Sequence, residues 1–217
     1  MKIINLSESN SLLNHFIAEI RDVKIQGDRM RFRRNLERIG EVMSVEISKT
    51  FPYTNTKIQT PLGEKQTQLA TDQLVIASIL RAGLPFHQGF LNYFDHAENA
   101  FIAAYRKHTS DDEFTIELEY IATPDLSKKI LILADPMLAS AWSMEQVFSR
   151  LLEFGKPKQV HLAAVIAAQP GIDYISEKLR HEDITLWTAT LDPELNSKSY
   201  IVPGLGDAGD LAFGEKL

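Results

Sequence analysis

The stretch KKILILADPMLASAWSMEQVF, Lys128 to Phe148, decides the fold. It passes from a continuous apolar run, 129–134, through a loop of small residues into a segment with apolar residues at helical spacing. A short apolar run of this kind predicts a strand buried on both faces, which is typical of parallel sheets covered by helices. We expect Ser143 to cap the helix and Gly155, followed by Pro157, to end it.

The same alternation of strand and helix continues on both sides of this stretch. Strands are predicted at 73–80, 100–106, 129–134, 159–168 and 184–190, with helices at 84–94 and 171–180. This order predicts an α/β fold with a parallel sheet wrapped by helices. Two helices precede it, at 7–23 and 28–50, followed by a hairpin at 56–70 that turns at Pro-Leu-Gly. The alternating segment 113–122 predicts an extended hairpin arm.

The bulk composition favours an ordinary globular protein. The chain of 217 residues fits one domain, 1–217, and its 44% hydrophobic content is sufficient for a continuous core. It has no cysteine, which excludes disulfides and thiolate metal sites. No run approaches the ~20 apolar residues that span a bilayer, so we expect a cytoplasmic protein. A net charge of −6 argues against nonspecific nucleic-acid binding.

Charged residues follow three of the predicted strands. Arg81 follows the strand 73–80, Arg106 ends the strand 100–106, and Asp135 follows the strand 129–134. Ligands of open parallel sheets bind just beyond the carboxyl ends of the strands. Arginine forks and a helix N-terminus suit phosphate oxygens, and a carboxylate suits Mg²⁺ or ribose hydroxyls. The pattern indicates a phosphorylated sugar or nucleotide. A single arginine after a strand is more often part of a surface ion pair than a ligand contact, and the loop alone could be an ordinary strand-to-helix turn.

Two further segments are distinctive. YIVPGLGDAGD, 200–210, has three glycines and no helical pattern after it, which predicts a rigid loop whose main chain contacts a flat ligand. It lacks the Gly-Lys-Ser/Thr of a Walker A loop. The basic run of the second helix is interpreted as a solvated or subunit-facing surface; it comprises Arg29, Arg31, Arg33, Arg34 and Arg38.

The motifs SILRAGL, AYRK, ILADPMLAS and YIVPGLGDAGDLAFG stand in the order and spacing of the uracil phosphoribosyltransferases. From about Arg21 to its last residue the chain resembles this family of type I phosphoribosyltransferases. The resemblance implies a parallel sheet with flanking helices, an extended β-arm and a C-terminal hood. It implies conversion of uracil and phosphoribosyl pyrophosphate (PRPP) to UMP and diphosphate. It also implies Mg²⁺ carried mainly by the diphosphate, with no protein metal ligand, and a homodimer or homotetramer.

The resemblance also assigns roles to residues. The catalytic residues would be Arg81, Arg106, Asp135 and Asp207. PRPP would contact Arg81, Arg106, Asp135, Pro136, Met137, Leu138, Ala139, Ser140, Ala141, Trp142, Ser143 and Asp207. Uracil would be read by Ile201, Gly206, Asp207 and Ala208, mainly through main-chain groups. His87 and His161 stand in apolar context and are interpreted as structural.

The phosphate loop departs from the family pattern. The family commonly has Thr-Gly-Gly-Ser after DPMLA, whereas this chain has Ser140, Ala141, Trp142 and Ser143. Ala141 is harmful if the loop needs a positive φ, and the Trp142 indole can point outward or cover the phosphate position. Three hypotheses follow: an active enzyme, an impaired homologue that acts as a nucleotide-binding or regulatory protein, and an RNA-binding regulator using the basic run. The acidic balance disfavours the third.

Overall fold

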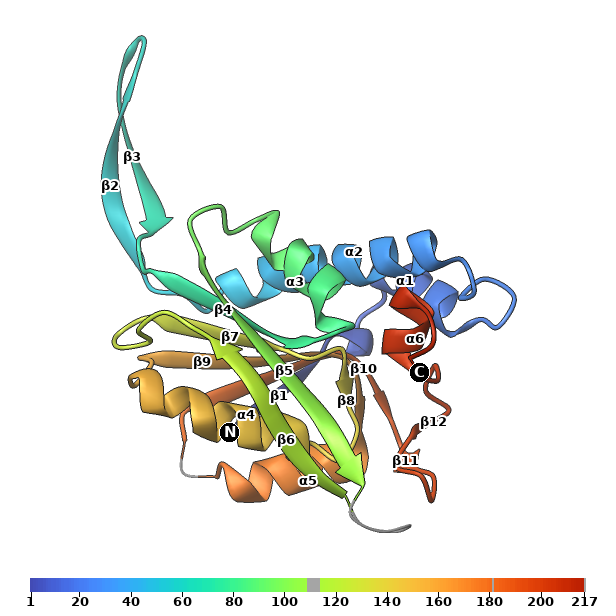
Figure 1. Ribbon diagram of the computed structural model, residues 1–217. Helices are drawn as coiled ribbons and strands as arrows, with labels where there is room; N and C mark the ends of the chain where they lie inside the picture. The colour runs from blue at the N-terminus through green and yellow to red at the C-terminus, as the bar shows by residue number, and fades with distance from the viewer. Residues whose placement is uncertain (109–113, 181, 217) are drawn as a thin grey trace.

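The computed structural model describes residues 1–108, 114–180 and 182–216, with the backbone alone for 104–108 and 114–118. In this part of the chain an eight-stranded sheet lies between two layers of helices (Figure 1). The upper layer in Figure 1 contains α1 (Leu13–Arg21), α2 (Arg29–Ser48) and α3 (Gly83–Leu91). The lower layer contains α4 (Trp142–Leu151) and α5 (Gln169–Lys178), so the predicted α/β class is confirmed.

In the described part of the chain, this sheet is parallel except at one of its edges. Its order is β1-β10-β9-β7-β4-β5-β6, with β8 beside β9, and only the pair β5–β6 is antiparallel. The strands are β1 (Lys2–Asn5), β4 (Leu74–Leu80), β5 (Glu98–His108), β6 (Phe114–Ala122), β7 (Ile130–Ala134), β8 (Met137–Leu138), β9 (Gln159–Ala168) and β10 (Ile184–Asp192).

The central strands are apolar because helices cover both of their faces. All five residues of β7 are buried, and alternate residues of β7 belong to two separate core clusters. Ile130 and Ile132 pack in the cluster shared with α1, α2 and α3, whereas Leu131 and Leu133 pack in the cluster shared with α4 and α5. This is why the sequence shows a continuous apolar run there instead of an alternating one.

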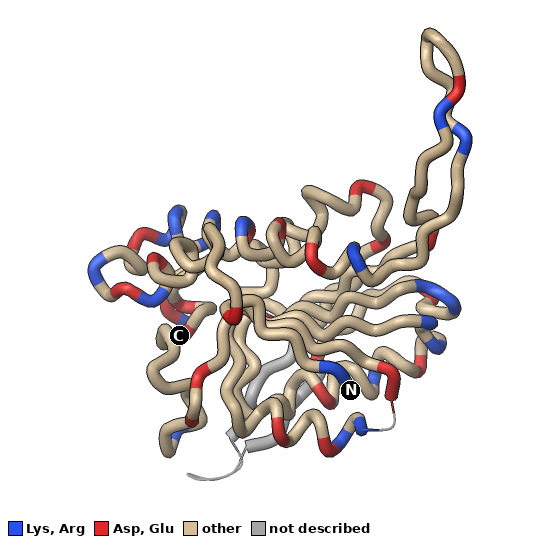
Figure 2. The backbone as a smooth tube through the Cα atoms, turned by 180° about the vertical axis from the view of Figure 1, so that it is seen from behind, with Lys and Arg blue, Asp and Glu red and all other residues tan. Residues whose placement is uncertain are grey.

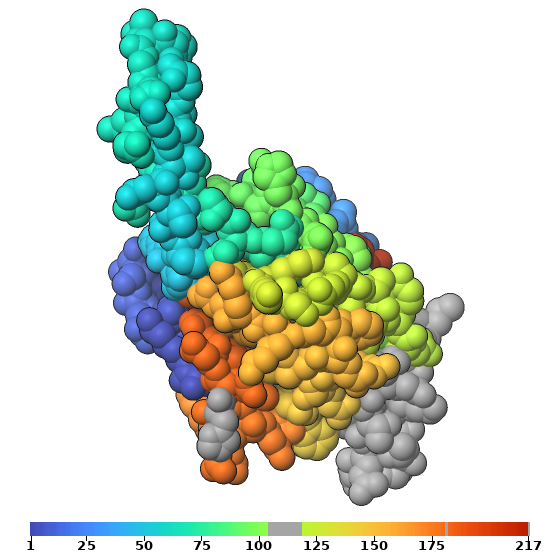
Figure 3. All heavy atoms as spheres, turned by 90° about the vertical axis from the view of Figure 1, so that its left-hand side faces the viewer, coloured from blue at the N-terminus to red at the C-terminus, as the bar shows by residue number. Residues whose placement is uncertain are grey.

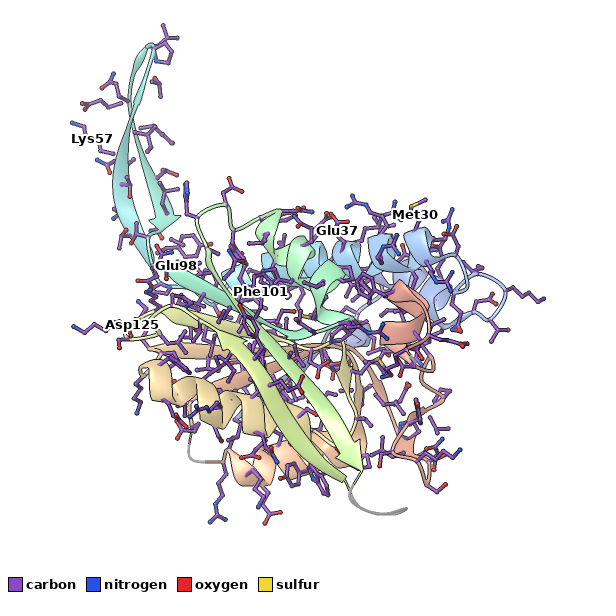
Figure 4. The ribbon with its side chains drawn as sticks, viewed as in Figure 1. Met30, Glu37, Lys57, Glu98, Phe101 and Asp125 are labelled. Atoms are coloured by element: carbon purple, nitrogen blue, oxygen red, sulfur yellow. The ribbon has the colours of Figure 1, made fainter. Side chains whose placement is uncertain are left out.

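A two-stranded hairpin, β2 (Tyr53–Thr60) with β3 (Gly63–Ala70), projects away from the body (Figures 1 and 3). It confirms the hairpin predicted at 56–70. Lys57 and Glu64 form an ion pair of 2.6 Å across it, and Figure 4 shows Lys57 on the outer side of this projection. The projecting arm of the fold is therefore this hairpin. The prediction of an arm at 113–122 needs correction, because β6 pairs along β5 and forms the edge of the main sheet.

Several short elements differ from the sequence prediction. The first helix begins at Leu13, after a 3-10 turn η1 (Leu6–Glu8), and α4 ends in a second such turn, η2 (Leu152–Phe154), before Gly155. β1 and β8 have four residues or fewer, too few to show a period. The segment 193–216, which we call the hood, contains β11 (Glu194–Leu195), β12 (Ile201–Val202) and α6 (Ala208–Phe213). The absence of a helix after the glycines was thus predicted wrongly: Asp207 caps α6 by accepting from Asp210 N at 3.0 Å.

The basic run on α2 is balanced by acidic residues (Figure 2). Arg34 pairs with Glu37 at 2.6 Å, and Arg31 pairs with Glu19 of α1 at 3.3 Å. Arg33 donates to the Ala212 carbonyl at 2.7 Å and so holds the end of α6. Figure 4 shows Met30 at the outer surface of the same helix. None of the described helices combines the length and apolarity needed to cross a membrane.

His161 lies in the middle of the sheet and is fully buried, as the structural interpretation expects. Its Nδ1 accepts a hydrogen bond of 3.0 Å from Trp187 Nε1. Burial lowers the pKa of His161 from 6.5 to about 4, because the imidazolium loses its hydration there. His87 is buried on α3, where its Nε2 lies 2.7 Å from Asn99 Oδ1, and burial also lowers its pKa.

The buried His161 makes the free energy of unfolding depend on pH. Its folded pKa is lower than its unfolded pKa, so its contribution is complete above 6.5 and is lost as the pH falls through 4. Between about pH 7.5 and pH 5 we expect a loss of ~2 kcal/mol from this residue. Urea unfolding of H161Q, which keeps an acceptor for Trp187, should show a correspondingly smaller loss. Equal losses in both proteins would contradict this assignment.

Candidate functional site

The candidate site begins where two neighbouring strands end. β4 and β7 are paired in parallel, with Ser78 opposite Ala134. The segments that follow, starting at Arg81 and Asp135, therefore leave the sheet side by side at its carboxyl edge. The peptide bond between Leu80 and Arg81 is cis. This arrangement confirms the predicted convergence of Arg81 and Asp135 on one edge.

Arg81 joins this edge to the hood. Its guanidinium forms an ion pair of 2.7 Å with Asp210 of α6 and donates to the Gly214 carbonyl at 3.3 Å. The side chain remains 40% exposed, so it is accessible to a ligand. Residues that are far apart in the sequence thus meet in one place, and the glycine-rich segment predicted to contact a flat ligand lies directly beside the predicted anion-binding arginine.

Gly83, two residues after Arg81, is required by close packing. A Cβ at this position would lie 2.3 Å from the Ser78 Oγ, which is fully buried beneath the start of α3. The glycine lets α3 begin directly above β4, and this sets the direction in which the chain carries Arg81. The sequence analysis did not include Gly83 or Ser78 among the site residues, because their role depends on contact between strand and helix.

Hydrogen bonds to a side chain and to the main chain hold the start of the loop after β7. Asp135 Oδ1 accepts from Met137 N at 3.2 Å, and the Pro136 carbonyl accepts from Val165 N at 3.0 Å. Met137 and Leu138 then form β8 against β9. The loop encloses a small pocket whose lining residues are Asp135, Met137, Leu138, Ala139, Ser140, Ala141, Ser143 and Met144. The first turn of α4 opens at this pocket with N–H groups that have no partner within the helix and with the positive end of its dipole, which suits an anion.

Trp142 lies outside this pocket. Its indole is 40% exposed, and its ring centroid lies 6.3 Å from that of Tyr174 on α5. Of the two orientations considered from the sequence, the structure shows the outward one. Trp142 is also the first residue of α4, so the prediction that Ser143 caps the helix is wrong. The capping position belongs to Ala141, and Ser143 lies inside the first turn with its N–H free for a ligand.

Ala141 has the positive φ that was considered from the sequence and that is unfavourable for alanine. Its φ is 64° and its ψ is 3°, which lie in the left-handed region that glycine adopts most readily. The side chain is 5% exposed and packs in the core cluster of α4 and α5. The strain of a left-handed alanine, about 1 kcal/mol, is therefore offset in part by the burial of its methyl group.

The residues predicted to read a base lie along the hood. Ile201 is buried and pairs with Leu195 between β12 and β11. Gly206 is exposed with a φ of 95°, and a Cβ there would meet no described atom within 4 Å. Asp207 and Ala208 begin α6, with Ala208 buried. The exposed main chain near Gly206 is thus the part of the hood that is open to a ligand.

Arg106 lies on β5 beyond the last residue paired with β4, which is Ala103. The strand continues to His108 instead of ending at Arg106 as predicted, because it pairs with β6. The side chain of Arg106 lies outside the described part of the structure. In that part, no cluster of three or more His, Cys, Asp or Glu is arranged to hold a metal ion.

A larger hollow exists at the opposite edge of the sheet. It lies at the amino ends of β9 and β10, and its lining residues are Pro52, Lys158, Gln159, Val160, Asp183 and Thr185. Among the described residues, this edge has no strand-to-helix loop, and none of the site residues predicted from the sequence lines the hollow. The carboxyl edge, although its pocket is smaller, is where parallel sheets place their ligands, and we take it as the candidate site.

The chain is similar to known proteins over almost its whole length. Residues 7–215 match the family described as uracil phosphoribosyltransferase. Proteins named uracil phosphoribosyltransferase are 54% identical over all of both chains in Porphyromonas gingivalis, and 36% identical in Pyrococcus furiosus over 97% of this chain and 89% of that one. The AQ2163 protein of Aquifex aeolicus is structurally similar, with a TM-score of 0.87, 29% identity and 98% of both chains covered. A hypoxanthine phosphoribosyltransferase of Staphylococcus aureus shares the fold at 12% identity, with a TM-score of 0.51 over 86% of this chain and 83% of that one.

The left-handed backbone of Ala141 predicts an asymmetric response to substitution. A141G relieves the φ strain but removes a buried methyl group, so the free energy of unfolding should change by less than about 1 kcal/mol. A141V places a β-branched side chain at a positive φ in a packed site and should cost about 3 kcal/mol. Urea unfolding of both variants measures the difference. Equal stability of A141V and the unchanged protein would contradict the left-handed assignment.

Proposed function

The chain belongs to the uracil phosphoribosyltransferase family, and from this premise we propose that it transfers the phosphoribosyl group of PRPP to uracil, giving UMP and diphosphate. The observation that carries the proposal is the ion pair between Arg81 and Asp210. It joins an arginine at the carboxyl edge of the sheet to the segment with the base-reading pattern. A phosphate-binding region and a base-binding region are thereby adjacent, as a reaction between a phosphorylated sugar and a base requires.

The donor would be held by the edge of the sheet. The N–H groups of the first turn of α4, which have no partner within the helix, suit the 5′-phosphate, and Asp135 suits the ribose hydroxyls. The Trp142 indole, which lies against Tyr174, leaves those N–H groups accessible. Arg81 and Arg106 suit the diphosphate, because arginine forks bind phosphate oxygens in pairs. A diphosphate at Arg81 would compete with Asp210 for the guanidinium.

The acceptor would be held by the hood. Ile201, Gly206 and Ala208 offer main-chain N–H and C=O groups, which can match the donors and acceptors on one edge of uracil. Asp207 stands between the exposed Gly206 and the start of α6, close to the Arg81 side of the site. Because Gly206 is open on its Cβ side, a flat ring can approach its main chain closely.

The chemistry then depends on charge stabilisation and alignment. The bond between C1′ and the diphosphate oxygen breaks, and its electron pair leaves with the diphosphate. Uracil N1 forms the new bond to C1′ and loses its proton. Positive charge develops on the ribose and negative charge on the leaving group, so arginines fixed at the diphosphate lower the barrier. Alignment of N1 with C1′ by the hood supplies the rest.

Mg²⁺ is proposed as the cofactor. This cation prefers oxygen ligands and usually keeps water and phosphate oxygens among them, with one or two protein carboxylates. No side chain is assigned as its ligand, and the cation would be carried mainly by the diphosphate. When bound, Mg²⁺ would neutralise charge that develops on the leaving group.

The other two hypotheses receive less support. The loop that motivated an impaired homologue keeps a pocket and directs its indole outward. The arginines that an RNA contact would need are engaged with neighbours, Arg31 with Glu19 and Arg34 with Glu37. Neither the geometry of the described residues nor the comparisons favour these alternatives over catalysis.

Incubation of the protein with uracil, PRPP and Mg²⁺ should yield UMP. R81K keeps the charge but loses the fork, and we expect kcat/KM to fall ~100-fold, in line with loss of one donor to a developing anion.

W142A should leave the KM for PRPP nearly unchanged, because the indole contacts Tyr174 instead of the pocket. R150K, on the far end of α4, is the control. Absence of UMP with the unchanged protein would refute the proposed function.

We also propose that the chain acts as a homodimer or homotetramer. The β2–β3 hairpin exposes large apolar side chains on its surface, including Ile58, Leu62 and Leu69. A two-stranded hairpin has little stability alone in water, so contact with another subunit would stabilise it. Light scattering should give at least two chains per particle. A strictly monomeric protein with full activity would contradict this proposal.

A further inference from the structure

A largely buried ion pair, between Arg21 and Asp192, contacts the hood. Arg21, the last residue of α1, forms a bidentate ion pair with Asp192, the last residue of β10. Its Nη2 donates to Oδ1 at 2.7 Å and its Nη1 to Oδ2 at 2.8 Å. The Asp192 side chain is 6% exposed and that of Arg21 is 21% exposed. The pair therefore joins an end of the N-terminal helical layer to the carboxyl edge of the sheet.

Both members of the pair bind the same residue of the hood. Asp192 Oδ2 accepts from Gly204 N at 2.9 Å, and Arg21 donates to the Gly204 carbonyl at 3.0 Å. Gly204 has a left-handed φ of 56°, and a Cβ there would lie 2.2 Å from the Ile201 carbonyl oxygen. The N–H and C=O of one glycine are thus both held by charged groups, which form the strongest class of protein hydrogen bond.

A second contact holds the next residue. Gln26 Nε2, just beyond α1, donates to the Leu205 carbonyl at 3.1 Å. Gly206 follows, and there the described contacts give way to open space. Gly206, the exposed member of the proposed uracil contacts, therefore follows directly after two residues whose main-chain groups are held.

Stability alone is a weak explanation of this pair. Removing two charges from water costs several kcal/mol per ion in a buried site, and their attraction often no more than offsets that cost. The pair instead orients the main chain. Arg21 at the end of α1 and Asp192 at the end of β10 fix the C=O and N–H of Gly204. The turn of the chain at Gly204 then sets where Gly206 and Ala208 present their main-chain groups.

We propose that Arg21 and Asp192 are positioning residues for the base. They act through Gly204 to orient the main chain that reads uracil, and they do not contact substrate themselves. The proposal rests on the proposed function and adds to it a specific consequence. Loosening the pair should weaken use of uracil much more than use of PRPP, because the phosphate loop and α4 are held by other contacts.

Steady-state kinetics with each substrate varied in turn tests this. R21K keeps a charge but cannot bridge Asp192 and Gly204 as a fork, and D192N removes the charge but keeps an acceptor. For both we expect the KM for uracil to rise ~10-fold and kcat to fall, with the KM for PRPP nearly unchanged. R31Q, which breaks the Arg31–Glu19 pair on the same helices away from the hood, is the matched control and should leave both KM values unchanged.

The outcomes separate cleanly. An unchanged KM for uracil in R21K and D192N, or equal rises for both substrates, would overturn the proposal. If either variant fails to fold, Q26M decides, because it removes only the bond to Leu205 and the local bonds to α1 carbonyls. A selective rise in the KM for uracil in Q26M supports the proposal, and no change overturns it. Failure of the unchanged protein to form UMP would instead refute the proposed function.

Discussion

The parallel pairing of β4, β7 and β9 is the constraint on which the rest of the structure depends. Because helices cover both faces, these strands are largely apolar, and they run in the same direction. The segments that follow these strands therefore all begin at the carboxyl edge of the sheet, before the chain enters the next helix. Asp135 and Arg81 are brought together by this pairing, since no hydrogen bond between the two segments is required to place them. The hood then contacts that edge through Asp210 and needs only a few bonds to complete the site.

The strength of the sequence signal explains what could be predicted. β7 and β9 were predictable because each contains an uninterrupted apolar run, ILILA in β7 and LAAVIAA in β9, which is typical of a buried strand. The strand ends followed directly, and with them Arg81 and Asp135. α6 was missed, since its six residues include glycine, aspartate and two alanines, and its start depends on the Asp207 cap. The Arg21–Asp192 contact was also invisible, because it joins residues 171 positions apart that carry no motif.

The loop after β7 shows how a motif can change without its new side chain entering the pocket. Anion binding at a helix N-terminus depends on main-chain N–H groups, so side chains matter mainly where they would occupy the ligand position. Trp142 stands at the first position of α4, where its side chain can leave the pocket and pack against Tyr174. The backbone requirement falls on Ala141 instead, which adopts the left-handed conformation without being glycine. The sequence raised both residues, and of the two it is Ala141 that carries the conformational cost.

The orientation of Trp142 also gives the molecule two contrasting chromophores. The chain has two tryptophans. Trp187 is 3% exposed and donates to His161 inside the sheet, whereas Trp142 is half-exposed at the rim of the loop. Indole emission shifts to longer wavelength in contact with water, so the two residues report separately on the interior and on the loop. The residue that interrupts the glycine pattern therefore supplies an intrinsic optical signal at the point where the donor would enter.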